Sequence, residues 1–124
     1  MTPDPEALDT IRVELDAAAG LEPGEALPHL RAAADRLTAL IDESMAEAVL
    51  AGKASLRSAG ASAGLSENAV GPRLARTRTL GAYANDDGRV TAAAVERAKY
   101  DRESGTPKPA PATQPLRFKP RRPS

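Results

Sequence analysis

The sequence predicts an all-α protein, and three features of the chain lead to this fold class. Apolar residues recur at steps of three and four over long stretches, which is the spacing of one helix face. Only 2% of the residues are aromatic, so the interior is built from Leu, Val, Ile and Ala, which suits closely packed helices. Glycines and prolines divide these stretches. The predicted order is an N-terminal helical hairpin, two short helices, one further helix and a tail.

The first helix is predicted over residues 5–18, where Leu8, Ile11, Leu15 and Ala18 share one face. Asp4 before Pro5 supplies a cap and a first-turn proline. The segment 20–24 ends this helix. The second helix is expected to begin near Pro28, because proline fits the first turn and is costly beyond it, and to end near residue 51. Its apolar stripe has seven members at alternating steps of three and four: Leu27, Leu30, Ala34, Leu37, Ile41, Ser44 and Ala48.

Two apolar-faced helices joined by a short turn are expected to pack as an antiparallel hairpin with acidic residues outside. In one interpretation the stripe is buried inside a single chain. In the other, its heptad-like spacing also pairs two copies of the protein, giving a homodimer through residues 5–51.

The zero net charge, 17 acidic against 17 basic residues, conceals a division along the chain. Residues 1–52 hold eleven acids and three bases, whereas residues 53–80 hold one acid and five bases. Residues 81–104 are nearly balanced, and the proline-rich segment from residue 105 holds five bases and no acid. Basic segments are where a polyanion binds. We interpret residues 105–124 as a disordered basic tail.

Between these segments the pattern predicts two short helices joined by a tight turn. Gly52 ends the long helix, and Ser55 caps a helix with Leu56, Ala59 and Ala63 on its apolar face. Gly64 permits a left-handed turn. Ser66 caps the next helix, in which Val70 and Leu74 are expected to point inward.

Pro72 conflicts with this second short helix, because an interior proline costs roughly 3 kcal/mol. The sequence therefore predicts either a kink at Gly71-Pro72 or a break with a new helix starting at Pro72. After it, Asn85 to Gly88 form a turn signal that also allows a small wing-like hairpin. Thr91 is expected to cap a last helix that runs to about Arg102.

The segment 37–80 resembles the helix-turn-helix of small bacterial DNA-binding proteins, in a three-helix arrangement of the homeodomain or sigma-region kind. The resemblance depends on Gly64-Leu65-Ser66 at the turn and on Ala69-Val70-Gly71-Pro72-Arg73-Leu74 in the second helix. It departs from the pattern at Gly60, where alanine is usual, and at Pro72.

The resemblance implies that four residues face a DNA major groove: Glu67, Asn68, Arg73 and Arg76. Their side chains can pair with cytosine, adenine, guanine or phosphate. The expected phosphate contacts are Lys53, Arg57 and Arg78, with Arg117, Lys119, Arg121 and Arg122 in the tail. The alternative is that these are ordinary solvated charges on a pair of helices.

Other classes of function find little support in the sequence. The chain has no cysteine, and its one histidine, His29, has no metal-ligand or nucleophile spacing around it. We expect no enzyme activity, no metal and no cofactor. Without a signal peptide or a long apolar run, we also expect no membrane association and a cytoplasmic location.

The sequence thus predicts an acidic hairpin over residues 1–52, a helix-turn-helix region with a C-terminal helix over 53–104, and the tail over 105–124. The predicted function is DNA binding by a small transcriptional regulator or a phage or mobile-element factor. The alternatives are a non-enzymatic helical adaptor for a protein partner and a recognition subunit for phage DNA packaging.

Overall fold

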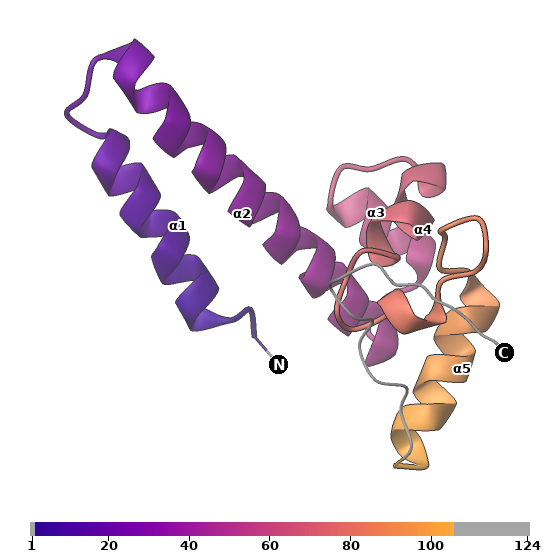
Figure 1. The fold of residues 1–124 in the computed structure, drawn as a ribbon. Coiled ribbons are helices and arrows are strands. Elements are labelled where there is room, and N and C mark those ends of the chain that lie inside the picture. Colours follow the sequence, from indigo (N-terminus) through magenta and orange to yellow (C-terminus); the bar gives the residue numbers. More distant parts are fainter. Residues whose placement is uncertain (1, 106–124) are drawn as a thin grey trace, which may run out of the picture.

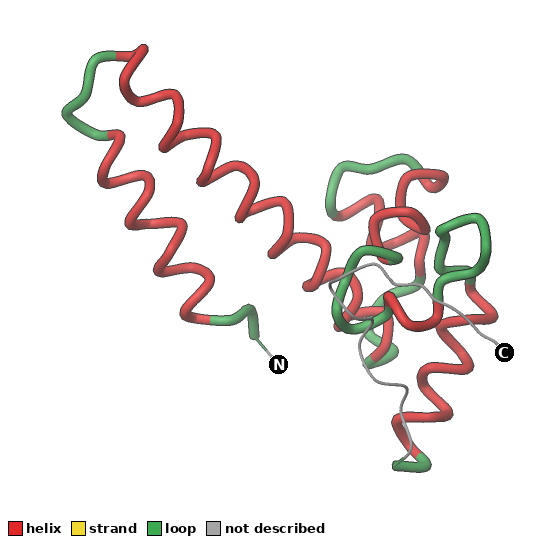
Figure 2. The backbone as a smooth tube through the Cα atoms, in the orientation of Figure 1, coloured by secondary structure: helices red, strands yellow, loops and turns green. Residues whose placement is uncertain are grey.

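A computed structural model describes residues 2–105, and within them the chain is all helical. Figure 2 shows helices and loops but no strand in this part of the chain. In order, the elements are α1 (Pro5–Ala18), α2 (Pro23–Leu50), α3 (Leu56–Ser62), α4 (Glu67–Leu74), a 3₁₀ helix (Gly81–Tyr83) and α5 (Ala92–Glu103). The all-α prediction is confirmed. The four tail residues predicted to contact DNA lie outside the described residues.

The helices α1 and α2 form an antiparallel hairpin that projects from a globular part built around the C-terminal end of α2 (Figure 1). The bounds of α1 agree with the prediction, and the Asp4 carboxylate accepts a hydrogen bond of 3.0 Å from the Glu6 amide. We call residues 2–41 the arm. Its buried seam consists of small or branched side chains, namely Ile11, Ala26 and Ala33.

The start of α2 differs from the prediction, because Pro23 and not Pro28 occupies its first position. Pro28 lies inside the helix and cannot donate a hydrogen bond to the Gly24 carbonyl. Gly24 is exposed, so water can satisfy that carbonyl and the helix continues through the proline.

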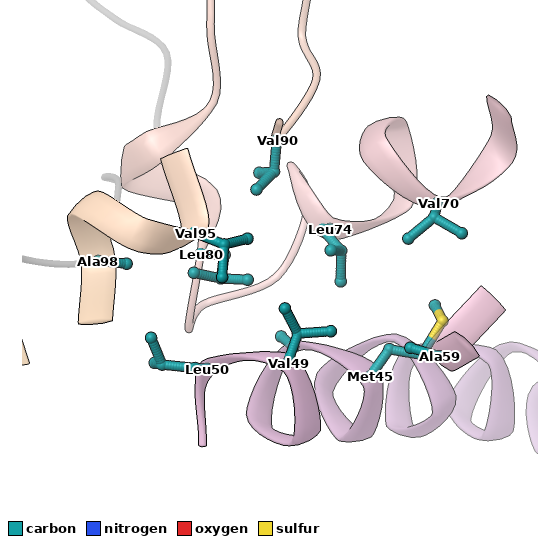
Figure 3. Packing of buried hydrophobic residues seen from close by; sticks show 11 residues of the cluster. Met45, Val49, Leu50, Ala59, Val70, Leu74, Leu80, Val90, Val95 and Ala98 are labelled. Atoms are coloured by element: carbon teal, nitrogen blue, oxygen red, sulfur yellow. The ribbon is translucent and has the colours of Figure 1, made fainter. Parts of the chain in front are cut away.

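The globular part encloses one apolar core to which every described helix except α1 contributes. Figure 3 shows Val49 and Leu50 of α2 below Leu74 of α4 and Leu80 of the following loop. Because α2 belongs both to the arm and to this core, the packing does not divide the chain at residue 52. The hairpin predicted for residues 1–52 and the region predicted for 53–104 share the last turns of α2.

Candidate nucleic-acid interface

The turn between α3 and α4 has the geometry that the sequence predicts. Ser55 and Ser58 form a reciprocal cap at the start of α3, with the Ser58 amide donating to Ser55 Oγ at 3.0 Å. At the other end Gly64 has φ of 76°. The Leu65 amide donates to the Gly60 carbonyl at 2.8 Å, which closes the helix with a left-handed cap. The chain then enters α4 at Ser66, whose side chain makes no capping hydrogen bond.

The helices α3 and α4 approach closely because residue 60 is glycine. A Cβ atom at Gly60 would lie 2.5 Å from Val70 Cγ2, which is closer than real Cβ contacts allow. Val70 and Leu74 are buried, as predicted. The glycine in place of the usual alanine is therefore what allows this tight pair to form.

The helix α4 is continuous through Pro72, so the predicted break does not occur. The Asn68 carbonyl, which Pro72 cannot bond, accepts a hydrogen bond of 3.0 Å from Arg89 Nη2 instead. The Val90 amide also donates to the Gly71 carbonyl at 3.0 Å. Arg89 therefore supplies the one donor that Pro72 lacks. The Val90 bond is an additional contact, because the Gly71 carbonyl already accepts from the Ala75 amide at 3.1 Å.

This segment follows a tight turn and not a wing-like hairpin. The Asn85 amide donates to the Arg89 carbonyl at 2.8 Å, and Asn85 Oδ1 accepts from the amides of Asp87 and Arg89. No strand forms on either side within the described residues. The turn thus serves to direct Arg89 toward α4.

Arg73 is predicted to be an exposed side chain, and the structure contradicts that exposure. Its Nε and Nη2 atoms both lie 2.7 Å from Asp42 Oδ1 in α2. The two side chains are only 22% and 12% exposed. Arg73 precedes Leu74 and follows Val70 by three residues, so it lies at the edge of the buried face and reaches α2. The sequence contains one indication of this ion pair. Asp42 lies four residues before the core residue Ala46, so it shares the buried face of α2 and needs a partner there.

The other residues predicted for α3 and α4 are exposed. Arg57 on α3 pairs with Glu67 at the start of α4 at 3.3 Å, and their side chains are 79% and 63% exposed. Asn68 is also exposed, with only its carbonyl bonded to Arg89. The start of α4 therefore presents an amide and a carboxylate to solvent, next to the Arg57 guanidinium of α3.

A second group of cations lies in the loop 75–80 that follows α4. Glu43 of α2 holds this loop, because its carboxylate accepts from the Arg78 amide at 2.6 Å and from Thr79 Oγ1 at 2.9 Å. Thr77 is buried and accepts from the Leu80 amide at 3.0 Å. Glu43 is not predicted from the sequence, since nothing in the local pattern connects it to a loop 35 residues away.

The side chains of Arg76 and Arg78 are exposed and form no ion pair within residues 2–105. The same holds for Lys53, which is exposed in the turn between α2 and α3. Every ion pair described around them uses other cations. These three residues are therefore available to an anionic partner without breaking a contact.

Other kinds of site are not apparent in the described part of the chain. Within residues 2–105, no group of three or more His, Cys, Asp or Glu side chains could hold a metal ion. No helix there has the length and apolar character needed to cross a membrane. Comparisons with known proteins add no relative: no family matches the chain, nor does any curated protein or solved structure.

Proposed function

We propose that this protein binds duplex DNA through α3, the Gly64 turn and α4. The observation that carries the proposal is the geometry of the two helices together with the cations around them. A short capped helix, a left-handed turn and a second helix with an exposed start make up a helix-turn-helix. Arg76 and Arg78 follow on a loop that Glu43 holds in place.

The contacts divide into two kinds. Asn68 at the start of α4 can reach a base edge, where its amide pairs with adenine. Arg76, Arg78 and Lys53 carry charges that no acid in the described residues neutralises, and these suit phosphate oxygens. Arg73 is already bound to Asp42, and Glu67 is paired with Arg57. Because few side chains remain for base reading, we expect modest discrimination between sequences.

The first test replaces both loop cations, as Arg76→Gln with Arg78→Gln. Each phosphate contact contributes about 0.9 to the slope of log affinity against log salt on duplex DNA. The double variant is expected to lower that slope by about 1.8 and to weaken binding about tenfold at low salt. Fluorescence anisotropy with a labelled random-sequence duplex at several salt concentrations measures both quantities.

The matched control is Arg12→Gln with Arg31→Gln, which removes the same charge from the arm. Both arginines are exposed and pair with acids on their own helices, at 2.8 Å with Asp9 and 3.0 Å with Asp35. The control variant is expected to bind DNA as the wild type does. Equal losses in the two variants mean that net charge alone sets the affinity, and the motif is then not the contact.

An adaptor for a protein partner is the second candidate function. It is favoured by one observation, the exposed leucines of α2 in the arm. Leu27 is 63% exposed, and Leu30 and Leu37 are 44% and 45% exposed. Large apolar side chains gathered on one surface mark an interaction site.

A further inference from the structure

The arm carries an apolar surface that the chain itself leaves open. We call it the leucine face, and it consists of Leu15 on α1 with Leu27, Leu30, Ala34 and Leu37 on α2. All five residues are exposed. Figure 1 shows the arm projecting away from α3, α4 and α5. We propose that a second copy of this chain binds there, so that two arms pack face to face as a four-helix bundle.

Helix geometry places these leucines on one side of the hairpin. Three of them follow a residue of the buried seam by four positions. The pairs are Ile11 with Leu15, Ala26 with Leu30, and Ala33 with Leu37. Each leucine is thus displaced in the same sense around its own helix. Because α1 and α2 are antiparallel, the same displacement moves both rows toward the same side of the arm.

The spacing on α2 suits pairing with another helix. Leu27, Leu30, Ala34, Leu37 and Ile41 follow steps of three and four, which is the heptad pattern of helix bundles. Ile41 is half-buried against the core of the globular part, whereas the four preceding members are exposed. The open part of the stripe therefore belongs to the arm.

The size of the face agrees with what a dimer needs. At about 1.5 Å per residue, residues 23–41 of α2 extend roughly 28 Å. Two helices packed side by side make a surface about 20 Å wide. Two copies then bury on the order of 1,000 Å² in total, which is near the lower end for specific interfaces. The expected association is therefore reversible and depends on concentration.

The charges next to the leucine face are compatible with a second copy as the partner, although the arm as a whole is acidic. No charged residue interrupts the stripe, and Arg31 and Asp35 beside it form a pair at 3.0 Å. An antiparallel two-fold pairing centred near Ala34 sets Arg31 of each copy against the edge that carries Asp35 of the other. In such a dimer Arg31 of one copy lies near Asp35 of the other, so this pairing brings opposite charges together.

Sedimentation of the full chain without DNA, across about two decades of concentration, tests this proposal directly. The wild type is expected to change from monomer to dimer mass as concentration rises. Leu30→Glu with Leu37→Glu places charges in the interface and is expected to weaken dimerisation at least tenfold. The matched control is Val13→Glu. Val13 is 65% exposed but lies two residues after Ile11, on the other side of α1, so its replacement leaves dimerisation unchanged.

A cross-link gives a second readout that does not depend on a destabilising charge. The chain contains no cysteine, so a single Ala34→Cys substitution near the two-fold axis is expected to form a disulfide-linked dimer under mild oxidation. Val13→Cys is expected to remain largely monomeric. Monomer mass at every concentration, or equal cross-linking of the two cysteine variants, overturns the proposal.

The effect of salt separates this proposal from DNA binding. The first 52 residues hold eleven acids and three bases, so salt screens repulsion between two arms. Dimerisation is expected to persist or strengthen as salt rises, whereas DNA binding weakens. Loss of the dimer in high salt contradicts an apolar interface.

Discussion

Replacing Arg73 by alanine is expected to lower the free energy of unfolding by about 2–3 kcal/mol. The substitution leaves the Asp42 carboxylate without its partner in a site where it is only 12% exposed. Breaking a fully buried ion pair costs about 3–5 kcal/mol, and the partial exposure of this pair reduces that cost. Urea denaturation followed by circular dichroism measures the difference.

Two further variants identify the cause of this loss. Arg76→Ala removes an exposed arginine from the same region and is expected to change stability by no more than about 0.5 kcal/mol. Asp42→Ala combined with Arg73→Ala removes both charges and is expected to be less destabilising than the sum of the two single changes. If Arg73→Ala is as stable as Arg76→Ala, the ion pair does not hold α4 to α2.

Replacing Gly60 by valine is expected to cost about 2–3 kcal/mol. The new Cβ would lie 2.5 Å from Val70 Cγ2, and Val70 is 1% exposed, so its side chain has no room to move away. The helices α3 and α4 must therefore separate, which opens the core. Thermal unfolding monitored by circular dichroism detects the change as a lower Tm.

The control for this substitution is Ala61→Val, which adds the same bulk at an exposed position of α3. It is expected to cost only the lower helix propensity of valine, about 0.7 kcal/mol or less. A smaller side chain at position 70 is expected to relieve the clash, so Gly60→Val with Val70→Ala couples favourably by about 1 kcal/mol or more. Additive effects of the two changes contradict direct contact between these positions.

Most helix boundaries follow from local features of the sequence. Asp4 with Pro5, Ser55 and Thr91 act as predicted because a cap depends only on neighbouring residues. Gly64 likewise adopts the left-handed conformation that its place in the turn requires. The start of α2 differs from the prediction because two prolines compete for the first turn, and the exposed Gly24 carbonyl makes the second proline tolerable inside the helix.

Periodicity indicated that α2 has an apolar face but not which partner that face meets. The predicted stripe at Leu27, Leu30 and Leu37 is exposed, while the smaller Ala26 and Ala33 form the seam with α1. Small side chains allow two helices to approach closely, and their weak hydrophobicity hides the seam from pattern analysis. The exposed stripe is what leaves a surface for a second copy.

The two short helices and the turn of the candidate site follow from the sequence, but the side-chain contacts between distant segments do not. The turn and the inward positions of Val70 and Leu74 follow from sequence, whereas the pairing of Arg73 with Asp42 depends on how α4 lies across α2. The bond from Arg89 to the Asn68 carbonyl likewise joins segments 21 residues apart. Such contacts are set by tertiary packing, which local spacing does not specify.

Mapping amide chemical shifts by NMR during titration with a short duplex tests the proposed DNA contact most directly. We expect the largest changes at the start of α4, around Glu67 and Asn68, and in the loop at Arg76 and Arg78. The α1 residues around Val13 are expected to remain unshifted. Shifts confined to the arm, or none at all at low salt, would contradict DNA binding through α3 and α4.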